Sequence, residues 1–196
     1  MFTKQTYKTL IGVEILLDST FWGWVWIYTS LYVMRSISDE TRAVVGIVEA
    51  ALGLAMVTIM RNRSIIDLFT KRIIPFQIAD MLFCIFTRFL VIAFPGIYYL
   101  CMTVRNNTVS NVTWTVFQDL ENRLFKGKER TDLTLLQRQM GAAGSLIGSG
   151  IAFMTTGIDI QIVTYSAAMV AVVYYLYEIW LLKNMKSLVA QEEQGN

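Results

Sequence analysis

The chain has 196 residues, of which 55% are apolar and 16% are charged, and its formal net charge is +2. A soluble domain carries about 25% charged residues, whereas here the charges gather in short runs between long stretches almost free of Lys and Arg. This distribution excludes a soluble globular domain, a disordered chain and a disulfide-rich scaffold, and the small net charge gives no support for nucleic-acid binding. It indicates an all-α, polytopic protein whose first partner is the lipid bilayer.

Several kinds of chemistry have no residues to support them. The chain has no histidine, which excludes metal or haem sites built on imidazole. Cys84 and Cys101 both lie in apolar sequence, where we expect inert thiols. No P-loop, nucleotide-binding fingerprint, or protease, lipase or thiol-oxidoreductase motif is present. We therefore expect no cofactor, no metal and no enzymatic activity.

Segments able to cross a bilayer follow one another along the whole chain, since about 20 mostly apolar residues suffice for one span. They are residues 9–34, 42–60, 73–94, 95–118, 138–157 and 159–183. The first is too long and too aromatic for a cleaved signal peptide, and Pro95 is expected to open the fourth helix. The sequence thus predicts one domain, residues 1–196, with six transmembrane helices.

Loop charge predicts the topology. With both termini cytoplasmic, the inner segments hold thirteen Lys and Arg residues and the outer loops hold only Arg35 and Arg42, in line with the positive-inside rule. The rival interpretation makes 104–137 an external loop with glycosylation sequons at Asn106 and Asn111, but it moves four basic residues outside. We expect a multi-pass protein of the cell membrane, with the inner loops 61–72 and 119–137 lying against the headgroups.

Ionisable residues inside the predicted spans are expected to face the bundle interior, because a charge in hydrocarbon costs about 2.5–3.5 kcal/mol. They are Glu14, Asp18, Glu49, Asp80, Arg88 and Arg105. Glu178 lies near the end of the last span, where its side chain is expected to reach the interface.

The first span carries a stripe of acids and indoles. Glu14, Asp18, Trp22 and Trp26 are each four residues apart and share one helix face. Such a stripe suits a cationic or aromatic substrate through charge and cation–π contacts, and an acid there can load and release a proton because burial disfavours the charged form. An aromatic interface belt with an inter-helix salt bridge fits equally well.

The third and fourth spans add polar faces. Asp80 and Arg88 are two turns apart, so each is expected to find its partner on another helix, and Arg105 is expected to pair with Asp18 or Glu49. A purely structural ion pair is an equally good interpretation.

On the fourth span, Asn107, Asn111, Thr115 and Gln118 share a face, which favours a water-filled path over inter-helix hydrogen bonding alone.

The fifth span is rich in small residues. Gly141, Gly144 and Gly148 let another helix approach closely. Tight packing within the chain is the first interpretation of this face, and dimerisation through it is the second.

From the arginine of the fourth span to the glycines of the fifth, the chain resembles the amino-terminal half of a major facilitator superfamily transporter. The resemblance rests on Leu100 to Thr108, with its Arg-Asn-Asn-Thr, on the charged loop Lys128 to Thr131, and on the glycines that follow, with Asp18 in the expected neighbourhood. It implies alternating access between two six-helix bundles around a midplane site. Because only one such bundle is present, it also implies a homodimer or a partner subunit.

The sequence leaves three functions open. The first is a proton-coupled secondary transporter subunit for a small molecule, with Asp18 and Arg105 central. The second is a substrate-binding membrane subunit of a multi-component importer, like the S-components of energy-coupling-factor importers. The third is a non-transporting immunity or regulatory protein, in which the intramembrane charges are structural.

Overall fold

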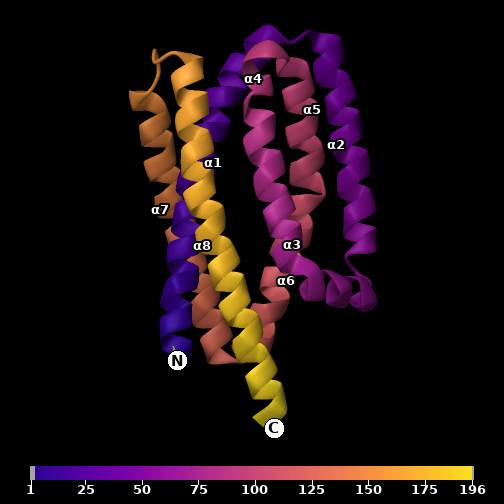
Figure 1. The fold of residues 1–196 in the computed structure, drawn as a ribbon, viewed down its shortest axis with the longest axis vertical. Coiled ribbons are helices and arrows are strands. Elements are labelled where there is room, and N and C mark those ends of the chain that lie inside the picture. The colour runs from indigo at the N-terminus through magenta and orange to yellow at the C-terminus, as the bar shows by residue number, and fades with distance from the viewer. Residues whose placement is uncertain (1–2, 196) are drawn as a thin grey trace. The chain divides into compact units, whose positions relative to one another are not determined.

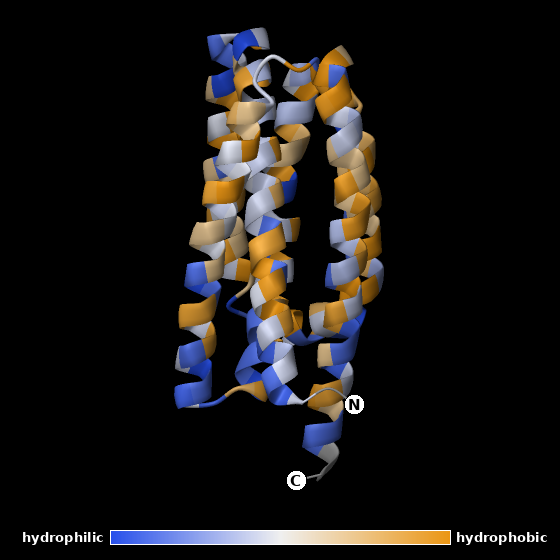
Figure 2. Ribbon diagram, turned by 90° about the vertical axis from the view of Figure 1, so that its left-hand side faces the viewer, coloured by the Kyte–Doolittle hydropathy of each residue, from blue (hydrophilic) through white to orange (hydrophobic). Residues whose placement is uncertain are grey.

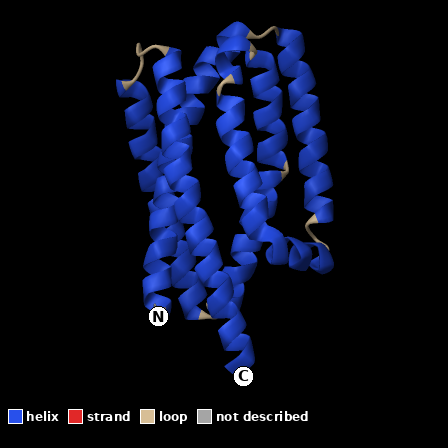
Figure 3. Cartoon of the chain, in the orientation of Figure 1, coloured by secondary structure: helices blue, strands red, loops and turns tan. Residues whose placement is uncertain are grey.

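The computed structural model describes residues 3–195, and its long elements are all helices (Figure 3). They are α1 (Lys4–Ser36), α2 (Asp39–Ile59), α3 (Arg63–Arg88), α4 (Leu90–Ala93), α5 (Pro95–Asn107), α6 (Val109–Leu124), α7 (Lys128–Met154) and α8 (Ile160–Gly195). The predicted all-α class is confirmed.

Three of these helices, α1, α2 and α8, are long and apolar enough to cross a membrane. Figure 2 shows that hydrophobic residues cover the long helices and that hydrophilic residues gather toward their ends. The predicted third and fourth spans are each divided, α3 from α4 and α5 from α6, and α7 begins with a charged stretch. The helices thus indicate a membrane protein, while the count of six spans and the side of the termini stay predictions.

The chain folds into two compact units, each assembled from separate stretches of sequence. Unit 1 contains residues 1–28, 117–157 and 170–196. Unit 2 contains residues 29–116 and 158–169. Unit 1 is therefore built from most of α1, the end of α6, all of α7 and most of α8, and unit 2 from α2 to α5 with the adjoining ends of α1, α6 and α8 (Figure 1).

In unit 1, α7 packs backbone to backbone against α1 through its glycines. A Cβ atom on Gly144 would lie 2.6 Å from the carbonyl oxygen of Leu16, and one on Gly148 would lie 2.9 Å from the amide nitrogen of Trp24. A Cβ atom on Gly141 would lie 3.6 Å from Cγ2 of Ile15, an ordinary contact distance. The first interpretation of the glycine face, packing within the chain, is the one that the structure shows.

In unit 2, local signals set the helix boundaries. The hydroxyl of Ser38 accepts a hydrogen bond from the Thr41 amide and caps α2. The side chain of Asn62 accepts from the Ser64 amide and caps α3. Pro95 opens α5, as predicted, because its missing amide proton would have no partner in a first turn.

The inner loop predicted over 119–137 is mostly helical, and part of it is buried in unit 1. Helix α6 continues to Leu124, and Gly127, at φ +53°, turns the chain into α7. Leu120, Leu124 and Leu133 are almost fully buried in unit 1. These three leucines extend the packed core of unit 1 beyond the end of the predicted fourth span, and the charges of the loop do not indicate this.

Candidate functional site

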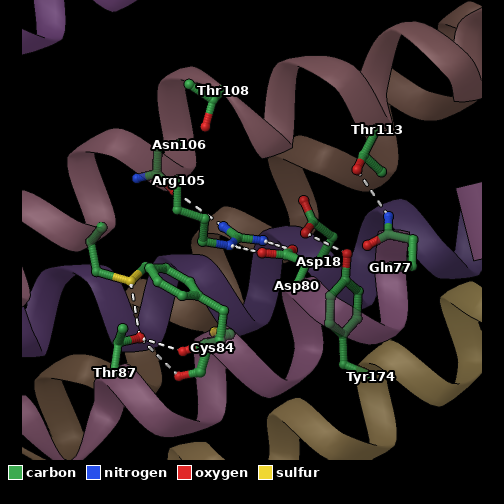
Figure 4. Close-up of polar contacts among 12 residues, drawn as sticks. Asp18, Gln77, Asp80, Cys84, Thr87, Arg105, Asn106, Thr108, Thr113 and Tyr174 are labelled. Carbon is green, nitrogen blue, oxygen red and sulfur yellow. Dashed lines mark hydrogen bonds and ion pairs between the residues drawn. The ribbon is translucent and has the colours of Figure 1, made fainter. Parts of the chain in front are cut away.

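Two of the sequence-predicted acids meet at one tyrosine in unit 1. The hydroxyl of Tyr174, on α8, lies 2.8 Å from Oδ1 of Asp18 on α1 (Figure 4). The same hydroxyl lies 3.3 Å from Oε1 of Glu14, also on α1. Glu14 is 4% exposed, and Asp18 is partly buried. The four-residue spacing of the acids places both carboxylates within reach of a single hydroxyl donor.

A third carboxylate, that of Glu178, belongs to the same neighbourhood. It lies one turn beyond Tyr174 on α8, is only 5% exposed, and interacts electrostatically with Glu14. The expectation that Glu178 reaches the interface is therefore wrong. The sequence shows that Glu178 lies one turn from Tyr174, but no local pattern connects either residue to α1.

Aromatic rings pack around Tyr174, the residue that hydrogen-bonds to two acids of unit 1. Phe21 stacks on Tyr174 with ring centroids 5.9 Å apart and an angle of 16° between the planes. Tyr175 and Trp22 extend this group edge-on, Tyr175 against Tyr174 at 5.2 Å and Trp22 against Phe21 at 5.1 Å. Trp26, the last member of the predicted stripe, is 37% exposed. Only the first indole of the stripe thus joins the aromatic group.

A buried ion pair joins α3 and α5 in unit 2. Arg105 donates from Nε to Oδ1 of Asp80 at 2.8 Å and from its second terminal nitrogen to Oδ2 at 2.7 Å (Figure 4). The two side chains are 6% and 2% exposed. The prediction that Asp80 needs a partner on another helix is confirmed, and that partner is Arg105. The expected pairing of Arg105 with Glu49 is wrong, because the Glu49 side chain is exposed. The alternative pairing with Asp18, a residue of unit 1, stays a prediction.

Glu49, by contrast, is exposed on α2. The expectation that every ionisable residue of the spans faces the interior is therefore wrong at this position. Helix α2 packs against α5 through the side of Gly53, where a Cβ atom would lie 3.5 Å from Oδ1 of Asn107. Helix α2 is otherwise little buried: only 6% of the residues in its apolar stretch are buried within the fold.

Arg88 is the largest fully buried side chain of unit 2. It is 1% exposed and donates to the hydroxyl of Tyr98 on α5 at 2.8 Å and to Sγ of Cys84 at 3.8 Å. The hydroxyl of Tyr98 in turn lies 3.5 Å from Oγ1 of Thr29, to which it can donate. The partner of Arg88 on another helix is thus a phenol, which can accept a hydrogen bond without adding a second charge to the interior.

Three polar side chains that share a face of α5 and α6 donate their hydrogen bonds to nearby backbone carbonyls. The side-chain nitrogens of Asn107 and Asn111 donate to the carbonyl oxygens of Thr103 and Asn107, and Thr115 donates to that of Asn111. This back-bonding satisfies polar groups locally, so the water-filled path stays a prediction. The cross-helix bond of this region, 3.0 Å between Gln77 and Thr113, joins residues that the sequence analysis had not singled out.

At one end of unit 1, Glu121 is 1% exposed and holds α7 from two points. Arg130 and Gln137 each donate to its carboxylate at 2.6 Å. Burial raises the pKa of Glu121 above its ordinary range, and the opposing effect of Arg130 and Gln137 does not fully offset it. Glu121 thus joins α6 to α7 through two hydrogen bonds, and it lies outside the predicted spans.

Among residues 3–195, no group of three or more metal-ligating side chains is placed to hold a metal ion. Comparisons with protein-family models, curated proteins and solved structures found no match to this chain. The arrangement of side chains therefore carries the functional argument by itself.

Proposed function

We propose that this chain is a subunit of a proton-coupled secondary transporter in the cell membrane. In this proposal it has six spans with both termini in the cytoplasm, and it works as a homodimer or with a second membrane subunit. The observation that carries the proposal is the meeting of Glu14, Asp18 and Glu178 around Tyr174 in unit 1, on two helices that are apolar enough to span the bilayer.

Three neighbouring carboxylates suit proton exchange. Acids that lie close together in an apolar setting cannot all remain ionised, because each charge disfavours the next. The Tyr174 hydroxyl can donate one hydrogen bond to whichever carboxylate is charged, and its shorter distance is to Asp18. Asp18 is also less buried than Glu14, so we assign Asp18 as the group that gains and loses the coupling proton.

The aromatic group beside the acids supports an organic cation as the substrate. Ring faces attract cations electrostatically, most strongly where water is excluded. Phe21, Trp22 and Tyr175 all lie within one or two rings of Tyr174. A cation that displaces the proton from Asp18 would couple the two movements in opposite directions.

The requirement for a second bundle comes from the resemblance to one half of a major facilitator superfamily transporter. In that family, two six-helix bundles rock around a site at the middle of the bilayer. A single bundle cannot close a path on both sides, so a second copy of this chain or a partner subunit completes the proposed transporter.

Purified protein in vesicles tests the proposal with ethidium as the probe cation. An imposed pH gradient is expected to drive ethidium accumulation, and Asp18→Asn is expected to abolish it while retaining the size-exclusion profile. The control is Asp132→Asn in the same unit, whose carboxylate is 49% exposed and lies 3.6 Å from the Lys8 amine. Gradient-driven uptake by Asp18→Asn equal to that of the unmodified protein would contradict the assignment.

A second measurement does not depend on the choice of probe. The infrared carbonyl band of protonated carboxyl groups is expected to titrate with pH in the unmodified protein. Asp18→Asn should remove part of this signal, and Asp132→Asn should leave it unchanged. A band that is identical in all three proteins would show that Asp18 exchanges no proton.

A further inference from the structure

The segment between the end of α2 and Pro75 carries a charge pattern that the proposed transport does not use. Its basic residues are Arg61, Arg63, Lys71 and Arg72. Two of them precede the single acid of the segment, and two follow it. That acid is Asp67, whose carboxylate lies 3.4 Å from the Arg63 guanidinium. Four cations against one anion leave a marked local excess of positive charge.

This segment begins where a membrane-crossing helix ends. Helix α2 has 21 residues and qualifies as a candidate span, and at 1.5 Å per residue it is about 31 Å long, close to the thickness of the hydrocarbon core. Residues 60–62 then connect it to α3. The first turns of α3 therefore start at the level of the lipid headgroups.

Pro75 lies inside α3, after these turns, where a proline favours a bend. A proline inside a helix removes one hydrogen bond and clashes with the carbonyl four residues earlier, here that of Lys71. In Figure 1 the first turns of α3 run crosswise before the helix turns toward α4. A crosswise helix at the headgroup level presents one of its sides to the bilayer surface.

The exposed side of these turns mixes one apolar side chain with the cations. Leu68 is 52% exposed, and Lys71 and Arg72 follow it at the third and fourth positions, on the same face. Elsewhere on these turns, Phe69 packs edge-on against Phe76 at 5.4 Å. The phenylalanine contact thus fixes the segment to the rest of α3, and the outer side combines the leucine and the basic residues typical of helices that lie in the interface.

We infer that residues 61–72 form a binding surface for anionic phospholipid headgroups. Arg61, Arg63, Lys71 and Arg72 contact the phosphates, and Leu68 inserts among the upper acyl chains. Each basic residue near an anionic leaflet adds to the attraction, which salt screens within a Debye length. The inference concerns a surface remote in sequence from Asp18, so it stands whether or not the chain transports a cation.

Native mass spectrometry of the full chain tests this surface, with phosphatidylglycerol and phosphatidylcholine as paired probes. The unmodified protein is expected to retain phosphatidylglycerol preferentially, with a preference that falls as ionic strength rises. Replacing Arg61, Arg63, Lys71 and Arg72 together by Gln is expected to reduce that preference about tenfold or more. Retention equal to that of the unmodified protein would overturn the inference.

A variant with the same change in net charge serves as the control. It replaces Arg35, Arg138, Lys183 and Lys186, which lie outside both predicted inner loops, by Gln. This control is expected to keep most of the preference for phosphatidylglycerol, and an equal loss in both variants would assign the effect to overall charge instead. Unfolding temperatures in detergent without anionic lipid verify that both variants fold.

Inorganic phosphate separates a lipid surface from a site for small anions. At constant ionic strength, phosphate is expected to leave phosphatidylglycerol retention unchanged. A single small anion cannot replace contacts that are distributed over several basic residues and the inserted Leu68. Competition by phosphate would show a discrete anion site in place of a lipid surface. Leu68→Asn is expected to weaken retention of both lipids, and no effect of this change would remove the insertion step.

Discussion

Single positions decide how closely two helices approach in this protein. Gly144 and Gly148 both face the backbone of α1, and neither leaves space for a Cβ atom. Gly150 lies two residues further along the same helix, and a Cβ atom added to it would have nothing within 4 Å. The same residue type therefore has two opposite consequences within three positions of α7.

Gly148→Ala is expected to destabilise the protein by about 1–3 kcal/mol, because the added methyl group forces α7 away from the backbone of Thr20 and Trp24. Gly150→Ala is expected to be neutral or to stabilise by up to about 1 kcal/mol through helix propensity. Denaturant titration in detergent, followed by circular dichroism, measures both. Equal losses in the two variants would contradict the close approach of α7 to α1.

At the scale of elements, the positions of helices could be predicted better than their neighbours. The apolar runs predicted at 9–34, 42–60 and 159–183 fall within or along α1, α2 and α8, and Pro95 marks the start of α5. Periodicity shows which residues share a helix face, but it does not show which helix that face meets. For this reason the sequence shows that Arg105 needs a partner but not that this partner is Asp80. For the same reason it places Glu49 in the bundle interior, whereas Glu49 is exposed.

The candidate site follows the same rule. The shared face of Glu14 and Asp18 could be predicted because both lie on one helix at a spacing of four. Tyr174 and Glu178 lie more than 150 residues later in the chain, and only the packing of α8 against α1 brings them to the acids. No local pattern carries that information.

The Asp80–Arg105 pair gives a measurable link between α3 and α5. Asp80→Asn is expected to cost about 3–5 kcal/mol, since it leaves a buried guanidinium without its counter-charge. The double variant Asp80→Asn, Arg105→Gln is expected to be more stable than the single variant, because it removes the uncompensated charge. A double-mutant cycle on unfolding free energies measures this coupling.

The matched control for that cycle is Asp67→Asn. Its partner Arg63 lies 3.4 Å away with both side chains largely exposed, so the loss should stay below about 1 kcal/mol. A cost for Asp80→Asn as small as that of Asp67→Asn would mean that water reaches the pair between α3 and α5.

For the whole molecule, the side of each loop is the property that separates six spans from the rival topology. With Cys84 and Cys101 replaced by Ala, a single cysteine at Ile37 is expected to react with a membrane-impermeant maleimide on intact cells. A single cysteine at Lys126 is expected to react only after permeabilisation, because the positive-inside bias places it in the cytoplasm. Labelling of Lys126→Cys on intact cells would support the external loop over 104–137.

The ion pairs of this protein belong to two classes that dissolved salt should distinguish. Near one end of unit 1, Lys4 pairs with Glu192 at 2.7 Å and Arg123 pairs with Glu193 at 3.2 Å, all with water-accessible side chains. Counter-ions weaken such contacts readily, whereas they barely reach a pair enclosed as Asp80 and Arg105 are. Raising ionic strength should therefore weaken the contacts that Glu192 and Glu193 of α8 make with α1 and α6, at salt concentrations that leave the Asp80–Arg105 pair intact. One solution variable would thus separate the exposed contacts of unit 1 from the enclosed pair of unit 2.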